Sequence, residues 1–308
     1  FGKTITESNH RLSYEEAQHI IENEERIIPK EKTILNKEKK VTNNLVDAIT
    51  TLNLVAKTIR KKRINNGAII FDKSEIKFKL DEKNNPKEVV FKTAKSANKL
   101  IEEFMLLANK RVAEKMKKGK ERFVYRVHDQ PDEEKLKNLQ TVVKRLGYNL
   151  ELNKNSLNES LNTLLENTFG KNEQNLIDTL MIRSMSKAEY TTKNIGHYGL
   201  AFDNYTHFTS PIRRYPDVLV HRLIEAELKN DKISTDELET LCNHSTHMEI
   251  LATKAERDSV KLMQIKYMLD KEGKIFESVI SGVTARGVFV EVVENKCEGL
   301  VKAKDLPG

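Results

Sequence analysis

The sequence predicts an α+β protein that is rich in helices, contains a small β meander and ends in the first strands of a small, incomplete β-barrel. Three observations support this fold class. Apolar residues recur at helical spacing over most of the chain, alternation at a period of two interrupts them over residues 68–91, and alternation returns after Gly273. The chain has 308 residues, of which 38% are hydrophobic, so a sizeable core can form.

The first half is predicted to contain three helices around the meander. Ser13 and Glu16 have the spacing of a capping box, so the first helix is expected to begin at Tyr14. A second helix, with Asn66-Gly67 as its stop, and a third amphipathic helix are expected over residues 43–62 and 97–116. One face of the second helix is expected to carry the apolar residues Leu45, Ile49, Leu52 and Ile59. The meander is expected to have strands over residues 68–71, 76–80 and 89–91.

The second half is predicted to be mostly helical until Gly273. The apolar periodicity predicts helices over residues 133–146, 156–166, 176–188, 236–243 and 248–269, and another that begins near Pro216. After Gly273, three alternating segments separated by glycine-containing bends predict the strands of the unfinished barrel.

Composition limits the class of protein. Lysine and arginine outnumber aspartate and glutamate by 53 to 46, which gives a net charge of +7 and a moderate bias toward polyanions. Cys242 and Cys297 stand alone, so a reduced protein without structural zinc is expected, and its location is predicted to be cytoplasmic. No apolar run reaches membrane-spanning length, and no obligate protein partner is evident. Because the chain opens at Phe1 and stops in mid-pattern, it is expected to be a fragment.

The segment HFTSPIRRYPDVLVHR, residues 207–222, is the most informative part of the chain. It places Arg213 and Arg214 between Pro211 and Pro216, just before a predicted helix. Two cations at a helix N-terminus are unfavourable unless an anion lies there, and a phosphate would be bound by guanidinium groups and helix amides. The alternative, a surface turn with solvated arginines, is equally compatible with the spacing.

Several blocks in order give the chain a family resemblance. They are RLSYEEAQHII, RKKRINNGAIIFDKSEIKFKLDE, ANKLIEEFMLLANKRVAE, YRVHDQPDEEKL, HYGLAFDNYTHFTSPIRRYPDVLVHRLI and AERDSV. With these blocks the sequence resembles the ribonuclease II/ribonuclease R exoribonucleases, most closely the ribonuclease R branch. The resemblance implies that residues 1–272 are the later part of the catalytic domain and that residues 273–308 begin an OB-fold RNA-binding domain. It also implies processive 3′→5′ hydrolysis of single-stranded RNA to nucleoside 5′-monophosphates with Mg²⁺.

The resemblance assigns roles to individual residues. Arg213 matches the catalytic arginine that contacts the phosphate being cut, where it would stabilise developing negative charge. Arg214 matches a position that accepts Arg or Lys and is expected to contact phosphate. Phe71 matches an aromatic residue that stacks on the terminal bases, an interaction worth about 1–3 kcal/mol per base. From the sequence alone, Phe71 is better described as a residue of a core strand.

Other residues are assigned to recognition of the strand. Tyr14 and Glu102 match positions that hydrogen-bond the ribose 2′-hydroxyl, which DNA lacks. Glu256 matches a glutamate near the 3′ end of the substrate. Without the resemblance, all three would be ordinary polar residues on helix surfaces. In the OB-fold part, Arg286 stands where an RNA-stacking aromatic is often found, and Phe289 keeps an aromatic side chain nearby.

The resemblance also indicates what the chain lacks. The aspartates that hold the metal are expected upstream of residue 1, so the chain alone is predicted to be inactive while its full-length parent is a magnesium-dependent nuclease. A non-catalytic RNA-binding relative that has lost those aspartates is the alternative. A general OB-fold binding protein with an unrelated helical domain is a third interpretation, and it leaves the two arginines without a reason.

Overall fold

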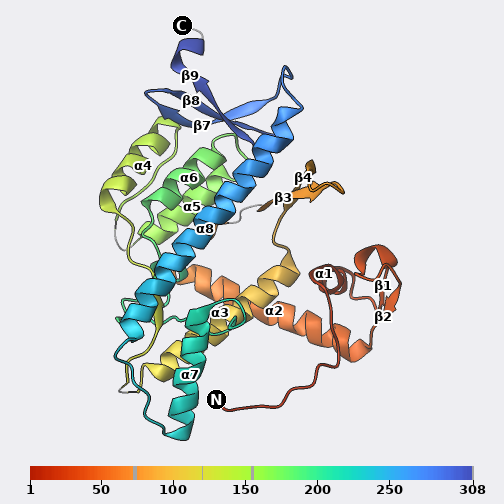
Figure 1. The fold of residues 1–308 in the computed structure, drawn as a ribbon, viewed down its shortest axis with the longest axis vertical. Helices are drawn as coiled ribbons and strands as arrows, with labels where there is room; N and C mark the ends of the chain where they lie inside the picture. The colour runs from red at the N-terminus through yellow and green to blue at the C-terminus, as the bar shows by residue number, and fades with distance from the viewer. Residues whose placement is uncertain (72–74, 120, 154–155, 307–308) are drawn as a thin grey trace. The chain divides into compact units, whose positions relative to one another are not determined.

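The computed structural model describes residues 1–71, 75–119, 121–153 and 156–306. The chain forms two compact units, the first comprising residues 1–68, 94–128 and 188–245, and the second comprising residues 69–93, 129–187 and 246–308. Both units combine helices with short antiparallel strands (Figure 1), so the predicted α+β class is confirmed. Among the described residues, no helix has both the length and the apolar character needed to cross a membrane.

The first unit opens with helix α1 (Tyr14–Asn23), and the predicted capping box is confirmed. The Glu16 amide donates to Oγ of Ser13 over 3.1 Å, and the Ser13 amide donates to Oε2 of Glu16 over 2.7 Å. A short antiparallel pair follows, β1 (Ile27–Ile28) with β2 (Lys39–Lys40), which encloses the 3₁₀ turn η1 (Lys30–Lys32). Ile20 of α1 packs with Ile28 in a small apolar cluster that closes this region.

Helices α2 (Asn43–Asn65) and α3 (Ser96–Met116) confirm the second and third predicted helices. The expected face of α2 is wrong in part, because Leu52 is exposed while Asn53 and Ala56 are buried. The buried Arg63 of α2 forms an ion pair with Glu103 of α3. The apolar pattern alone did not reveal this polar contact.

The rest of the first unit builds its main core. Strands β5 (Tyr125–Val127) and β6 (Glu189–Thr191), which the sequence did not predict, pair in antiparallel fashion. The 3₁₀ turn η2 (Tyr198–Leu200) precedes helix α7 (Tyr215–Lys229), which begins near Pro216 as predicted. Buried side chains of α3, β5, β6 and α7 form one cluster around Val124 and Val220, both 0% exposed.

The predicted meander is a two-stranded hairpin in the second unit. Strands β3 (Glu75–Leu80) and β4 (Pro86–Lys92) pair antiparallel, and Asn84 adopts φ of 60° in the turn between them. The prediction of a strand over residues 68–71 is wrong, because these residues form no strand. Ala68 and Ile69 are buried instead, so their apolar character reflects burial of a connecting segment.

Three predicted helices of the second unit are confirmed as α4 (Glu133–Arg145), α5 (Leu157–Thr168) and α6 (Gln174–Ser184). They pack through fully buried residues such as Leu139, Leu161 and Met181. Burial of each such side chain stabilises the unit by about 1.5–3 kcal/mol. Helix α6 ends four residues before the predicted end, because β6 begins soon afterwards at Glu189.

Helix α8 (Leu238–Leu269) is continuous, as Figure 1 shows, whereas the sequence predicted two helices. Residues 244–247 separate the two predicted helices. Oγ of Ser245 donates to the Leu241 carbonyl over 2.7 Å, which satisfies this hydroxyl within the helix, and the stretch contains no glycine or proline. Residues of α8 up to Ser245 belong to the first unit, and the later ones belong to the second.

The chain continues into a three-stranded antiparallel sheet, as predicted. Strands β7 (Ser278–Thr284), β8 (Gly287–Val292) and β9 (Glu298–Lys302) pair in that order, and the 3₁₀ turn η3 (Ala303–Asp305) follows. Nδ2 of Asn175 in α6 donates to Oε2 of Glu291 in β8 over 2.8 Å, which ties the sheet to the helices of its unit. Gly287 has φ of 145°, and a Cβ atom there would lie 2.1 Å from the Val301 carbonyl oxygen.

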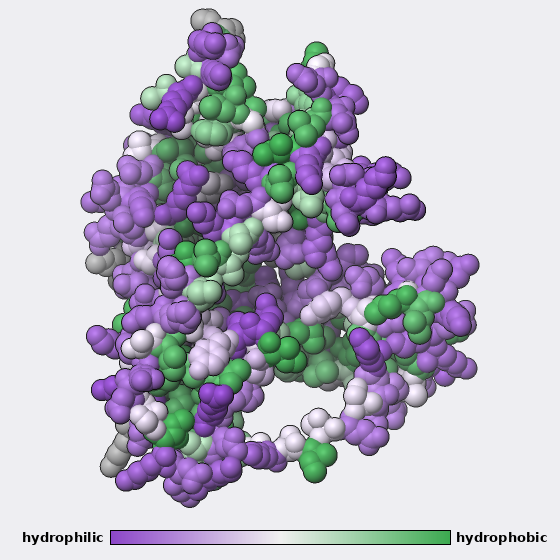
Figure 2. Space-filling model, viewed as in Figure 1, coloured by the Kyte–Doolittle hydropathy of each residue, from purple (hydrophilic) through white to green (hydrophobic). Residues whose placement is uncertain are grey.

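Hydrophilic side chains dominate the face of the molecule shown in Figure 2, and hydrophobic residues appear there in scattered groups. This distribution agrees with a charged fraction of 32%. Both cysteines, Cys242 and Cys297, are free and buried, and burial raises the pKa of the Cys242 thiol to about 12. Neither thiol is therefore poised to react as a thiolate at neutral pH.

Candidate nucleic-acid interface

The loop before α7 is fixed at both ends by hydrogen bonds. The amides of Arg213 and Arg214 donate to the Ser210 carbonyl over 3.3 and 3.1 Å. The Ser210 amide donates to Oδ1 of Asp217 over 2.8 Å, and Asp217 lies in the first turn of α7 with 0% exposure. The loop is therefore closed on the helix that follows it. Its backbone has little freedom to move independently of α7.

The two arginines of this loop have different surroundings. Nη2 of Arg214 donates to Oδ1 of Asp217 over 2.8 Å, so this half-buried guanidinium is engaged inside the unit. Arg213 is exposed, and within the described part of the chain its side chain forms no hydrogen bond or ion pair. Arg213 is thus the member of the pair that presents its guanidinium to solvent, while Arg214 helps to hold the loop.

Asn109 holds the N-terminal end of the segment 207–222, and its role was not predicted from the sequence. This α3 residue is 2% exposed, and its Oδ1 accepts hydrogen bonds from the Phe208 and Thr209 amides over 3.0 and 3.2 Å. Its Nδ2 donates to the Tyr205 hydroxyl over 3.1 Å. An amide in the apolar pattern of a helix was the signal that could have found it, because a buried polar side chain needs partners.

Two largely buried histidines, His207 and His197, belong to the same unit as the loop. Burial, reinforced by the charges of Arg214 and Arg126, lowers the pKa of His207 to about 2, so the imidazole is neutral at physiological pH. Its Nδ1 lies 2.7 Å from the Tyr190 hydroxyl. Burial likewise lowers the pKa of His197 to about 3. Both rings are uncharged at neutral pH and pack among aromatic side chains, and His207 also forms a hydrogen bond.

The four predicted site residues of the first unit lie on three elements. Arg213 and Arg214 belong to the loop, Tyr14 opens α1, and Glu102 lies on α3. Tyr14 is 44% exposed, and the Glu102 side chain is 49% exposed. Both can therefore reach a ligand from solvent.

An arginine pair lies next to Glu102. Nη1 of Arg60 lies 3.9 Å from Oε1 of Glu102, and Nη2 of Arg63 lies 3.8 Å from the same oxygen. Both arginines come from α2 and also contact Glu103. These contacts restrict the direction in which the Glu102 carboxylate extends from α3.

The other three predicted site residues belong to the second unit. Phe71 is half-buried and precedes β3, outside any strand. Glu256 is exposed on α8. Phe289 lies on β8 opposite Leu300 of β9, and its ring carbon would lie 3.8 Å from a Cβ placed on Gly282, so the ring packs across the sheet.

The described residues contain no group of three or more His, Cys, Asp or Glu side chains that could hold a metal ion. The buried carboxylates are already engaged: Asp217 binds Arg214, and Glu103 binds Arg63. The side chains of the described part therefore do not fit a Mg²⁺ site, which needs several convergent carboxylate oxygens.

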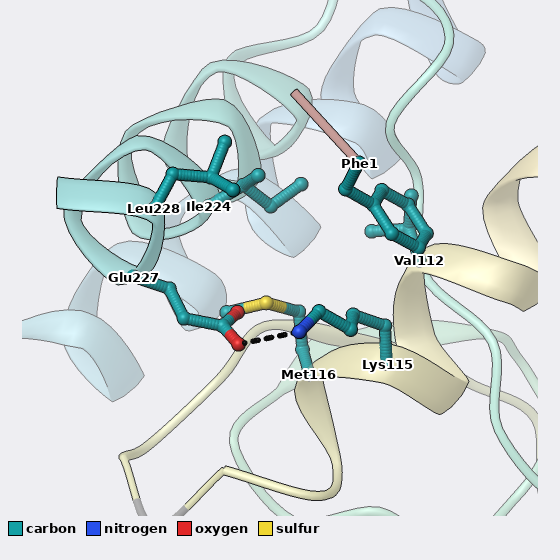
Figure 3. A pocket seen from close by; sticks show the side chains of 7 residues that line it. All are labelled: Phe1, Val112, Lys115, Met116, Ile224, Glu227 and Leu228. Carbon is teal, nitrogen blue, oxygen red and sulfur yellow. Dashed lines mark ion pairs between the residues drawn. The ribbon is translucent and has the colours of Figure 1, made fainter. Parts of the chain in front are cut away.

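A hollow between α3 and α7, of about 200 Å³ including open solvent, is shown in Figure 3. Its lining is mainly apolar and includes Val112, Met116, Ile224 and Leu228. The polar groups there are Lys115 and Glu227, which form an ion pair of 3.1 Å with each other. The lining is consequently neutral and offers little to a charged ligand.

Comparison with known proteins gives matches over most of the chain. The RNB domain model matches residues 1–230. Ribonuclease R of Aquifex aeolicus is 37% identical over 267 residues, which cover 85% of this chain and 38% of that protein. Ribonuclease R of Escherichia coli is 31% identical over 319 residues, which cover 99% of this chain and 38% of that protein. The chain thus spans somewhat over a third of the length of these relatives.

Solved structures agree with the sequence matches. Mycoplasma genitalium RNase R in complex with ribose methylated single-stranded RNA superimposes with a TM-score of 0.82 at 26% identity, over 88% of this chain and 44% of that one. Yeast Ssd1, a pseudonuclease, shares the fold alone, with a TM-score of 0.63 at 22% identity over 84% of this chain and 33% of that one. The chain therefore belongs to the RNB domain family, and its similar relatives include bacterial ribonucleases R.

Proposed function

We propose that the full-length protein is a hydrolase that degrades single-stranded RNA processively from its 3′ end and releases nucleoside 5′-monophosphates. The proposal is supported by family membership and by the relatives named ribonuclease R. The observation that carries it in this chain is the exposed guanidinium of Arg213 on a loop held by Ser210 and Asp217. We place this RNA degradation in the cytoplasm. We propose no obligate protein partner for it.

The role of Arg213 follows from its position. A phosphate under attack develops negative charge on its oxygens, and a guanidinium carried by an ordered loop stabilises that charge more than it stabilises the ground state. Because the loop is already ordered, little reorganisation is needed when the phosphate arrives. Arg214 keeps the loop in place through its ion pair with Asp217. We assign it a second role as a phosphate contact.

The described residues of this chain form no site for the metal that the reaction needs. Exoribonucleases of the RNB family generally depend on a divalent metal ion. We assign Mg²⁺ to this protein, with ligands outside these 308 residues, and expect the chain alone to be inactive. When bound, the ion would polarise the phosphate and generate the attacking hydroxide.

The strand is recognised by residues of both units in this proposal. The Tyr14 hydroxyl donates to or accepts from a ribose 2′-hydroxyl, and the Glu102 carboxylate accepts from it. Phe71 stacks on a base, and Glu256 lies near the 3′ end. Residues 1–272 form the later part of the catalytic domain. Residues 273–308, with Phe289 on the central strand β8, form the first part of an OB-fold that binds the strand.

The test uses the full-length protein and single-stranded RNA labelled at either end, with and without Mg²⁺. Arg213→Ala is expected to slow cleavage by about a hundredfold or more while RNA affinity changes little, because the lost interaction acts in the transition state. Arg222→Ala is the matched control, since Arg222 is an exposed arginine of α7 outside the loop. A cleavage rate of Arg213→Ala equal to that of the control would overturn the assignment.

A non-catalytic RNA-binding relative of the same family is the alternative. That protein would bind the labelled strands but leave them intact in Mg²⁺. Release of mononucleotides by the full-length protein would exclude it.

A further inference from the structure

His221 of helix α7 contacts the segment that leads into the arginine loop, residues 210–214. Its ring stacks on the Phe208 ring, with 4.3 Å between the ring centroids and 17° between the planes. Its Nε2 lies 2.9 Å from the Phe208 carbonyl oxygen. Because a carbonyl oxygen can only accept, Nε2 of His221 is the donor. One exposed side chain therefore holds both the backbone and the ring of Phe208.

Phe208 depends on such contacts because residues 205–210 lie outside any helix or strand. Backbone groups of this segment have no regular ladder to join, so side chains supply their partners. Oδ1 of Asn109 accepts from the Phe208 amide over 3.0 Å, and His221 donates to the Phe208 carbonyl. The Phe208 ring also packs against the main core of the first unit. Phe208 is thus joined to α3, to α7 and to the core.

The contact made by His221 has a counterpart about one turn earlier in α7. Asp217 lies four residues before His221, so both side chains lie on the same face of the helix. Asp217 accepts from the Ser210 amide over 2.8 Å, and His221 donates to the carbonyl of Phe208, two residues before Ser210. Four residues of helix rise about 6 Å, and two residues of extended chain span about 6.6 Å. The two spacings match, and the segment is held against α7 at two points, which together form a clamp.

The clamp determines where the backbone of Arg213 lies. The amides of Arg213 and Arg214 donate to the Ser210 carbonyl, so the turn that carries Arg213 is built on Ser210. Ser210 is itself fixed between Asp217 and the clamped Phe208. Within the described part of the chain, the Arg213 side chain forms no hydrogen bond or ion pair, so the placement of its guanidinium depends on the backbone beneath it.

We propose that His221 is a positioning residue for Arg213. It keeps the start of the arginine loop against α7 and so holds the guanidinium in place for the phosphate that is cut. This role rests on the proposed function, whereas the clamp itself does not. A catalytic group misplaced by about 1 Å can cost about a hundredfold in rate, so a single contact at the base of the loop is enough to affect cleavage.

The first measurement is hydrogen–deuterium exchange of residues 205–214 in the full-length protein, followed by mass spectrometry. His221→Ala is expected to speed exchange in this segment by about five- to tenfold, because losing one hydrogen bond favours local opening by that factor. His221→Gln keeps a donor and His221→Phe keeps an aromatic ring, so each is expected to restore part of the protection. His244→Ala is the matched control, because His244 is an exposed histidine of the same unit, and it is expected to leave exchange unchanged.

The second measurement is single-turnover cleavage of labelled single-stranded RNA by the same variants. His221→Ala is expected to lower the cleavage rate by about tenfold while RNA affinity changes little, because Arg213 acts in the transition state. His221→Gln is expected to recover part of the rate. A merely structural role would lower the folded fraction without changing the rate of the folded enzyme, and circular dichroism at the assay temperature measures that fraction.

The outcomes are distinct. Faster exchange together with slower cleavage in His221→Ala supports the positioning role. Exchange equal to that of His244→Ala overturns the clamp and the proposal with it. Faster exchange with an unchanged cleavage rate overturns the positioning role and leaves the proposed nuclease intact. If the unmodified protein does not cleave RNA at all, the proposed function and the positioning role both fail, and the exchange measurement still decides whether the clamp exists.

Discussion

Replacement of Asp217 by alanine tests whether the arginine loop is held as the hydrogen bonds indicate. Oδ1 of Asp217 accepts from the Ser210 amide and from Nη2 of Arg214, each over 2.8 Å. The carboxylate is 0% exposed, so water cannot take over either role without opening the unit. Asp217→Ala removes the acceptor of a half-buried amide and of a half-buried guanidinium at once.

The expected loss can be worked out from these two contacts. A hydrogen bond to a charged group contributes about 1.5–3 kcal/mol, and removing one partner of a fully buried ion pair costs about 3–5 kcal/mol. The Arg214 side chain is 21% exposed, so water partly solvates the stranded guanidinium and the cost lies near the low end. We expect the free energy of unfolding to fall by about 3 kcal/mol. Asp217→Asn keeps the acceptor oxygen but not the charge, and we expect it to lose about half as much.

The assay is urea unfolding of the 308-residue chain at neutral pH, followed by far-ultraviolet circular dichroism. Asp203→Ala is the matched control, because Asp203 is an exposed aspartate of the same unit, and a surface substitution changes stability by about 0.5 kcal/mol or less. If Asp217→Ala unfolds at the same urea concentration as Asp203→Ala, the loop is not held by this carboxylate. The proposed pre-ordering of its arginine then fails as well.

Two further predictions concern protonation and sugar recognition. The pKa values of His207 and His197 are lowered to about 2 and about 3, so below pH 6.5 the unfolded chain binds protons that the folded chain does not. The free energy of unfolding is therefore highest above pH 6.5. It falls as the pH is lowered from there, by up to about 1.4 kcal/mol per pH unit for each ring. Unfolding of His207→Gln between pH 7 and 5 is expected to show a flatter pH dependence, whereas the exposed His244→Gln is expected to keep the original slope, and equal slopes would contradict the assignment. In the full-length protein, Tyr14→Phe and Glu102→Ala are each expected to narrow the preference for RNA over DNA by about two- to tenfold, the range for one lost hydrogen bond. Competition between matched RNA and DNA strands measures this ratio, and an unchanged ratio in both variants would reject 2′-hydroxyl recognition by these residues.

Elements with local signals could be predicted from the sequence. The capping box of Ser13 and Glu16 located the start of α1, because both hydrogen bonds join residues three apart. Pro216 located the start of α7 for a similar reason, since proline is preorganised for the first turn of a helix. The three strands after Gly273 were also predicted, because short segments with valine, isoleucine or phenylalanine are separated there by bends.

Features that depend on distant partners could not be predicted in this way. Arg63 and Glu103 are both buried, but neither is marked in its own helix, since their compensation comes from a residue 40 positions away. Asn109 likewise acquires its role only through amides of the loop, which lies about a hundred residues further along the chain. Strands β5 and β6 have three residues each, too few for a periodicity to be recognised.

The candidate site likewise combines a feature with a local signal and features that depend on distant partners. The segment with Arg213 and Arg214 was identified because its prolines and cations are adjacent in the sequence. Its support by Asp217 and Asn109 was not, because hydrogen bonds to a loop leave no periodic trace. The different surroundings of the two arginines became visible only when the ion pair of Arg214 was located.

Gly287 has a consequence for how the terminal sheet can change over evolutionary time. Any other residue at the start of β8 would drive its first side-chain carbon into the carbonyl oxygen of Val301 and separate two neighbouring strands. The position therefore tolerates a single amino acid, whereas the adjoining Arg286 is exposed and unconstrained by packing. Evolution can thus alter the chemistry displayed at this bend, one residue at a time, without altering the path of the backbone beneath it.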